Sequence, residues 1–305
     1  VKDKKFTLSD DITPESLDIP DNVKDIIRSK IDRLSSRTLG FVKRCSVIGM
    51  KIPVKPFTEI FESGEEDIAN FIEELIPKDF MQYYSVGRDT VIFKHAIAQQ
   101  VVYDSLLFSQ RQEIHLKIAE WYLTQLKSDT SHSSSSSIES EESYEHDPFN
   151  SIIAYHNFKA VECGHRGQQI ISNGISWNLL VAKNELIFSV HHAEPFVRRV
   201  LYMLDYMDDS NPEMKRKCQL KAHFMMGQIY QAQHGFISEL MRDEYHTVLQ
   251  YCTPKDIKKK IAVRLIMISF EIEFTRSVFS FSFRLNGILE SITSTLRTEK
   301  RVTTF

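Results

Sequence analysis

Glycine and proline are scarce in this chain of 305 residues, which holds 10 glycines and 9 prolines. Tight turns between strands depend on these two residue types, so their scarcity disfavours a β-sandwich or a β-barrel. Leu, Ile, Lys, Glu and Gln are plentiful, and these residues favour helices. The composition therefore predicts a mainly helical protein.

Cysteine is also rare, and its pattern excludes two kinds of site. Cys45, Cys163, Cys218 and Cys252 lie far apart in the chain and form no Cys-x-x-Cys pair. A zinc site or a disulfide framework needs closer or more regular spacing. We therefore expect idle or buried thiols in a reducing compartment, and a cytoplasmic location.

A strong net charge and a long apolar run are both missing. The formal net charge is −3, which creates no general attraction to nucleic acid or to an anionic membrane. The first residues, VKDKKFTLSDD, lack the apolar core of a signal peptide. The most apolar stretch, 261–283, contains Arg264, Glu271, Glu273 and Arg276, which a bilayer core disfavours. The sequence predicts neither a membrane nor a nucleic acid as partner.

Catalytic motifs are absent as well. The chain has no GxxxxGK[ST], HExxH or GxSxG motif and no kinase signature. His191 and His192 are adjacent and have no carboxylate or cysteine at ligand spacing, so surface or capping roles are favoured. The basic clusters at 215–217 and 255–260 are short and lie among acids, which indicates solvated helix faces. We predict no catalytic residue, no metal site and no enzyme activity in this segment.

The first half of the chain has the pattern of a small domain with a β-hairpin. Apolar residues recur at helical spacing in IPDNVKDIIRSKIDRL, between Arg37 and Ile48, and in EEDIANFIEELI, with Gly49 placed to end the second helix. A third helix, around Phe57 to Phe61, is short at best because Pro53 and Pro56 confine it. DFMQYYSV and TVIF flank a GRD turn and predict two strands. This order predicts a winged-helix domain with a following helix over 19–127, behind a polar leader at 1–18.

A serine-rich, acidic segment follows that domain. Ser128–Asp147 holds nine serines, six acids and no Lys or Arg, and such a segment cannot offset the entropy of ordering. The sequence therefore predicts a disordered linker at 128–147. Ser136 and Ser140 precede acidic residues and are candidate sites for an acidophilic kinase, although composition alone favours a plain spacer.

The remainder, 148–305, reads as paired helices. In AHFMMGQIYQAQHGFISELMRDEYHTVLQYCTP, small residues in one helix face aromatic residues in the next, as in a tetratricopeptide repeat. We predict an incomplete TPR-like antiparallel array and expect Tyr230 to be buried between two helices. The stretch SVFSFSF alternates like a strand, and we expect an interrupted helix there.

Three stretches together resemble one family: IPDNVKDIIRSKIDRLSSRTLGFVKRCSVIG, VIFKHAIAQQVVYDSLLFSQRQEIHLKIAEWY and IIAYHNFKAVECG. They are similar to the region behind the AAA-type ATPase module of STAND-class signalling proteins, above all of soluble class III adenylyl and guanylyl cyclases. The resemblance covers Ile19 to Gly164. In those relatives the cyclase domains and the P-loop precede the matched region.

The resemblance implies a regulatory role within a longer protein. This chain would be a non-catalytic segment that couples nucleotide state to partner sensing, behind domains that bind ATP or ADP with Mg²⁺ and make a cyclic nucleotide. Its partners would be the upstream nucleotide-binding domain and a protein recognised by the helical array. Two alternatives stay open: the middle region of a STAND DNA-binding transcriptional regulator, and a passive helical scaffold.

His95 is the candidate site residue that the resemblance implies. In STAND proteins a histidine ends the last strand of the winged helix, opens the next helix and faces the phosphates of ADP on another domain. FKHAIAQQVVYDSL resembles that arrangement, with Ala96 where the family motif has Asp. The alternative is a histidine that caps its helix or packs against the hairpin. We expect His95 to be partly exposed and without a partner in this segment.

Overall fold

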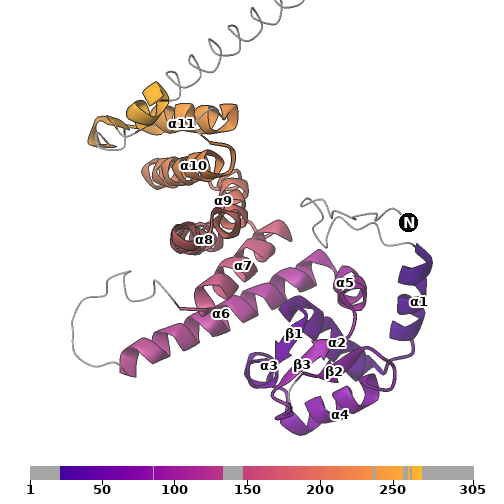
Figure 1. Ribbon diagram of the computed structural model, residues 1–305. Coiled ribbons are helices and arrows are strands. Elements are labelled where there is room, and N and C mark those ends of the chain that lie inside the picture. Colours follow the sequence, from indigo (N-terminus) through magenta and orange to yellow (C-terminus); the bar gives the residue numbers. More distant parts are fainter. Residues whose placement is uncertain are drawn as a thin grey trace, which may run out of the picture. The chain divides into compact units, whose positions relative to one another are not determined.

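The computed structural model describes residues 21–84, 86–132, 147–235, 238–256, 260–261 and 263–269 (Figure 1). The chain divides into two compact units. The first unit comprises Val1–Ser128 and Lys159–His165, and the second comprises Asp129–Phe158 and Arg166–Phe305. Helices dominate the described part of both units, and the first unit also contains a small antiparallel sheet, which agrees with the mainly helical composition.

The first unit contains three short strands, which lie among five short helices and are followed by most of a long sixth helix. Its elements are α1 (Asp21–Ile31), α2 (Ser36–Ile48), β1 (Lys51–Pro53), α3 (Val54–Phe61), α4 (Glu65–Leu75), β2 (Met81–Tyr83), β3 (Thr90–Phe93), α5 (Ala96–Asp104) and α6 (Phe108–His132). Ser35 begins α2 by accepting a hydrogen bond from the amide of Thr38 at 3.2 Å, a standard N-cap. Gly49 ends α2, as its sequence position predicts.

The sheet has the strand order β1-β3-β2, and both pairs are antiparallel. Ile52 pairs with Val91, and Met81 pairs with Phe93. The predicted hairpin of β2 and β3 is confirmed, but the prediction of only two strands is wrong. β1 spans three residues and includes Pro53, so it has too few alternating positions to reveal a strand by its pattern.

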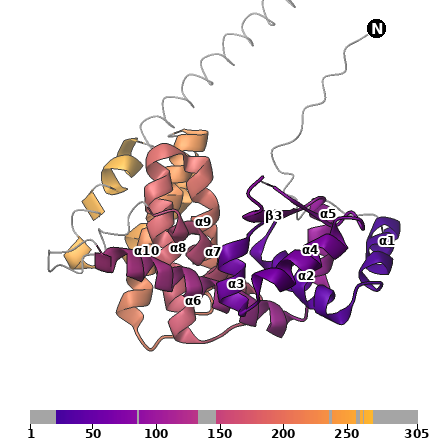
Figure 2. The ribbon, with the colours of Figure 1, turned by 90° about the horizontal axis from the view of Figure 1, so that it is seen from below.

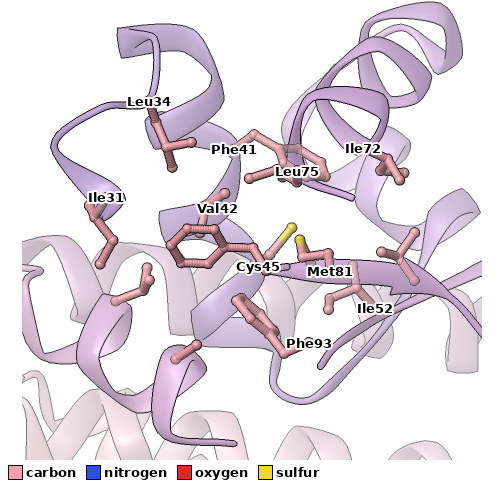
Figure 3. Packing of buried hydrophobic residues seen from close by; sticks show 14 of the residues in the cluster. Ile31, Leu34, Phe41, Val42, Cys45, Ile52, Ile72, Leu75, Met81 and Phe93 are labelled. Atoms are coloured by element: carbon pink, nitrogen blue, oxygen red, sulfur yellow. The ribbon is translucent and has the colours of Figure 1, made fainter. Parts of the chain in front are cut away.

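The core of the first unit forms where α2 faces the sheet. Figure 3 shows Phe41, Val42 and Cys45 among side chains from other elements, including Met81 of β2 and Phe93 of β3. All five are almost completely buried. Phe57 of α3 adds a ring contact to Phe41, with centroids 5.0 Å apart. This packing fixes the carboxyl end of β3, and thereby the position of the residues that follow it.

The second unit is built from successive helices: α7 (Phe149–Glu162), α8 (Gln168–Phe188), α9 (Val190–Leu204), α10 (Pro212–His234), α11 (Glu239–Tyr251) and a 3₁₀ turn (Pro254–Asp256). Only the part of α7 up to Phe158 belongs to this unit. α8 packs on α9, α9 on α10 and α10 on α11, and Figures 1 and 2 show α8, α9 and α10 side by side. Each of these helices therefore packs mainly against its neighbours in sequence.

A glycine and a tyrosine set the distance between α10 and α11. Tyr245 of α11 is fully buried, and its hydroxyl donates to Oε1 of Gln231 at 3.1 Å. The ring lies against Gly227 of α10, where an added Cβ would come within 2.6 Å of the Tyr245 Cε1 atom. Tyr230, the aromatic predicted to be buried here, is only partly buried, so that prediction is corrected to Tyr245.

Three sequence predictions fall wholly or mostly on residues that the structure does not describe. α6 runs to His132, so residues 128–132 are helical and not part of a disordered linker. The rest of that segment up to 146, with Ser136 and Ser140, lies outside the described residues, as do the leader and SVFSFSF. Within the described residues, no helix is both long enough and apolar enough to cross a bilayer.

Candidate functional site

His95 occupies the N-cap position of α5, directly after β3 and one linking residue. Its backbone is extended, with φ −133° and ψ 126°, and its side chain makes no capping hydrogen bond. The side chain is 62% exposed. The side chain of His95 therefore does not cap its own helix, whereas its backbone carbonyl accepts hydrogen bonds from the amides of Ala98 and Gln99.

Asp79 holds the imidazole of His95. The Nε2 atom of His95 lies 3.2 Å from Oδ2 of Asp79, within hydrogen-bonding distance. The ammonium group of Lys94 donates to the other carboxylate oxygen, Oδ1, at 2.5 Å. The expectation that His95 would have no partner is therefore wrong. Asp79 precedes His95 by 16 residues on a different element, so no local spacing rule could have paired them.

A turn at the end of α4 places Asp79. The amide of Asp79 donates to the carbonyl of Ile76 at 3.1 Å, and the amide of Phe80 donates to that of Leu75 at 3.2 Å. These two bonds form a Schellman motif, in which Asp79 takes the left-handed position that glycine usually fills. Its φ is 63°, a conformation that Asp tolerates better than most residues. Glycine would suit this backbone equally well but would leave Lys94 and His95 without a carboxylate.

The charges at the site favour an ionised Asp79. The hydrogen bond from Lys94, followed by that from His95, lowers the pKa of the Asp79 carboxyl. Lys78 is paired with Glu74, its Nζ lying 2.6 Å from Oε1. The amino end of α5 adds partial positive charge beside His95. The site thus combines an exposed imidazole, a carboxylate that orients it and nearby ammonium groups.

A pocket of about 290 Å³ opens beside His95. Its wall is apolar and is formed by Val23, Ile27, Phe80, Ile97 and Ala98. Polar residues complete the lining: Lys30, Lys78, Asp79 and His95. All of these residues belong to the first unit. The arrangement can bind an anion through charge and hydrogen bonds, but the residues that line the pocket include no Ser, Thr or Cys nucleophile.

The adjacent histidines and the cysteines, the other candidates within the described residues, belong to no metal-ligating cluster. His191 and His192 are exposed, and Nδ1 of His192 lies 3.6 Å from Oε2 of Glu185. No group of three metal-ligating side chains occurs among the described residues. Cys45, Cys163 and Cys218 are buried, and burial raises the pKa of each thiol, which disfavours the reactive thiolate.

The basic cluster at 215–217 is more structural than expected. Arg216 donates to the carbonyl of Tyr251 at 2.7 Å and to Oδ2 of Asp256 at 2.9 Å, and its side chain is only 18% exposed. It also pairs with Glu213 on its own helix. Arg216 therefore attaches the end of α11 to α10 and is not a solvated charge, which corrects the prediction for this residue.

No family model matches the chain, and no curated protein matches its sequence. The functional assignment therefore depends on the geometry around His95 and on the resemblance of the three stretches.

Proposed function

We propose that this chain is a non-catalytic regulatory and interaction segment of a larger STAND-class signalling ATPase, of the type found in soluble adenylyl and guanylyl cyclases. The observation that carries the proposal is the exposed His95 at the joint of β3 and α5, oriented by Asp79. In this role His95 contacts the phosphates of ADP on an upstream nucleotide-binding domain. The nucleotide, its Mg²⁺ and the catalytic groups belong to that longer protein.

The topology of the first unit supports a winged-helix assignment. The order α2-β1-α3-α4-β2-β3, with the strand order β1-β3-β2, is the order of helices and strands in a winged helix. In STAND proteins the sensing histidine follows the last strand of this domain. His95 follows β3 at the corresponding place, and α5 begins directly after it.

The same topology disfavours the DNA-binding alternative. In a winged helix the base-reading element is the helix before the hairpin, which here is α4. α4 reads EEDIANFIEEL, with five acidic residues and no Lys or Arg. Its charge would repel the phosphate backbone that supplies most of the affinity for DNA. A role as a DNA-binding regulator is therefore not proposed.

The chemistry at His95 can distinguish two nucleotide states. An imidazole N–H donates to a phosphate oxygen, and the amino end of α5 favours a negative group nearby. Asp79 orients the ring but carries a negative charge of its own. In the proposed switch, ATP displaces this contact and ADP retains it. A difference in affinity between two states is what a nucleotide switch requires.

The helical second unit supplies the interaction half of the proposal. α8, α9, α10 and α11 pack in succession, and Gly227 allows a close approach of α10 and α11 at Tyr245. This packing supports a TPR-like array. Such arrays present an extended surface to a protein partner, which would be the sensed component.

The test uses a protein that carries this segment behind its nucleotide-binding module. His95→Ala removes the phosphate donor, so we expect ADP to dissociate about tenfold faster, as for the loss of one hydrogen bond to a charged group, and basal output to rise. His192→Ala, at another exposed histidine, is the matched control and should change neither quantity. Unchanged ADP release from a folded His95→Ala protein would contradict the proposal.

A further inference from the structure

We propose that the pocket between α1 and α5 binds a small carboxylic acid with a short apolar tail. This inference does not depend on the nucleotide proposal, because the pocket lies wholly within the first unit. It assigns a ligand class to a cavity that neither the sequence motifs nor the resemblance point to.

The apolar wall calls for an apolar ligand body. Val23 and Ile27 lie four residues apart on one face of α1, and Ile97 and Phe80 complete the wall of the pocket. Ile97 is 40% exposed, so the pocket leaves apolar surface in contact with water that a ligand would cover. A polar or highly hydrated ligand would gain nothing from this wall.

The size of the pocket restricts the ligand to a small molecule. Its volume of about 290 Å³ is at the lower limit of ordinary ligand sites. A nucleotide needs more space and also polar groups that recognise its base, and the wall supplies no such groups. The fit is to a chain of several carbons or to a single ring.

The charges beside the pocket indicate the polar end of the ligand. Lys78 is neutralised by Glu74, and Lys94 is neutralised by Asp79. Lys30 also lines the pocket, and within the described residues it forms no ion pair with a carboxylate. Among the described residues, this leaves one unpaired positive charge, that of the exposed Lys30, beside an apolar pocket. A carboxylate attached to an apolar tail complements both features, whereas a neutral or cationic ligand complements only one or neither.

The ligand would connect two elements of the first unit. α1 packs mainly on α5, and the pocket lies between them, beside the joint that contains His95. A bound tail would contact Ile27 of α1 and Ile97 of α5 together. Occupancy therefore adds contacts that hold α1 against α5 in the bound state.

The binding test uses this chain without any nucleotide. Octanoate is titrated while the methyl NMR signals of Ile27 and Ile97 are followed. We expect saturable shifts of both signals with a Kd of about 1 mM, a typical affinity for a ligand of this size. Octan-1-ol has the same tail without the charge and should bind at least about tenfold more weakly, and acetate, which lacks the tail, should not shift either signal.

Two variants and a control locate the ligand. Lys30→Gln removes the excess charge and should weaken octanoate binding about fivefold to tenfold. Lys55→Gln, at an exposed lysine of α3 in the same unit, is the matched control and should bind octanoate like the wild type. Ile97→Glu places a negative charge at the mouth on a partly exposed position, and should abolish binding while the other methyl signals show an intact fold.

Three results would overturn the inference. The first is unmoved Ile27 and Ile97 signals at about 10 mM octanoate, tenfold above the expected Kd. The second is equal affinity for octanoate and octan-1-ol, which would remove the role of the charge. The third is equal weakening by Lys30→Gln and Lys55→Gln. Because no nucleotide is present, none of these results bears on the ADP contact of His95.

Discussion

At the scale of single residues, Asp79 shows how one side chain can serve the fold and the site at once. Its backbone closes the turn after α4, and its carboxylate binds Lys94 and His95. Glycine is the usual residue in that left-handed position. The presence of Asp instead is explained by the two side chains that it holds, because neither bond is needed to end α4.

A second residue, His156 of α7, makes stability depend on pH. Burial lowers its pKa to about 3, so the imidazole is neutral in the folded second unit. In the unfolded chain it takes up a proton near its ordinary pKa of about 6.5. Because only the unfolded chain takes up this proton, the free energy of unfolding is highest above about pH 6.5. It decreases as the pH falls from there toward about 3.

We expect the free energy of unfolding of the second unit to decrease between about pH 7 and about pH 5 by about 2 kcal/mol on account of His156. Urea unfolding can be followed by the fluorescence of Trp177, which lies in this unit, in a Trp121→Phe background. His156→Gln removes the titrating group and should flatten the pH dependence. An equally steep loss in the His156→Gln variant would assign the effect to other groups.

At the scale of elements, the contact of α10 with α11 depends on the absence of a side chain at Gly227. Gly227→Ala would drive a methyl group into the rigid, buried ring of Tyr245. We expect a loss of about 1–3 kcal/mol in the free energy of unfolding, as in other overpacked cores. Urea unfolding with Trp177 fluorescence measures it.

Gly174→Ala in α8 provides the matched control within the same unit. Its Cβ would meet the sulfur of Met203 at 2.8 Å; Met203 is as buried as Tyr245, but its flexible thioether changes rotamer more easily than the rigid ring. The gain in helix propensity, about 0.5–1 kcal/mol, offsets much of the remaining cost. Equal losses for the two substitutions would show that the Tyr245 ring does not set the distance between α10 and α11.

Much of the fold was predictable from the sequence because periodic burial is a local property. The apolar spacing in 37–48 and 65–75 indicated α2 and α4, and the change to β-forming residues around GRD indicated β2 and β3. β1 escaped because three residues are too few to show a period. Tyr230 was chosen over Tyr245 because both lie at helical spacing, and only the approach of Gly227 decides which ring is buried.

The candidate site was only half predictable, for a similar reason. His95 was indicated by resemblance, at the joint of a strand and a helix that the pattern also shows. Its partner Asp79 could not be found, because a turn and a strand pairing bring it to His95 from 16 residues upstream. The pocket was not predictable either, since it depends on how α1 packs against α5 and not on any motif.

At the scale of the whole molecule, we assign different roles to the two units. The first unit carries His95, Asp79 and the pocket, and the second carries the successive helices. In the proposed function, the first unit reports a nucleotide state and the second presents a surface to a partner.

The central claim is that His95, held by Asp79, retains ADP. Its most direct test is a double-mutant cycle on the ADP dissociation rate, in a protein that carries this segment behind its nucleotide-binding module. His95→Ala should accelerate release about tenfold, the loss of one hydrogen bond to a charged group. Asp79→Asn should change the rate more when His95 is present than in the His95→Ala background, where only its charge and its pairing with Lys94 are lost. Equal effects of Asp79→Asn in both backgrounds, or an unchanged rate in His95→Ala, would contradict the account.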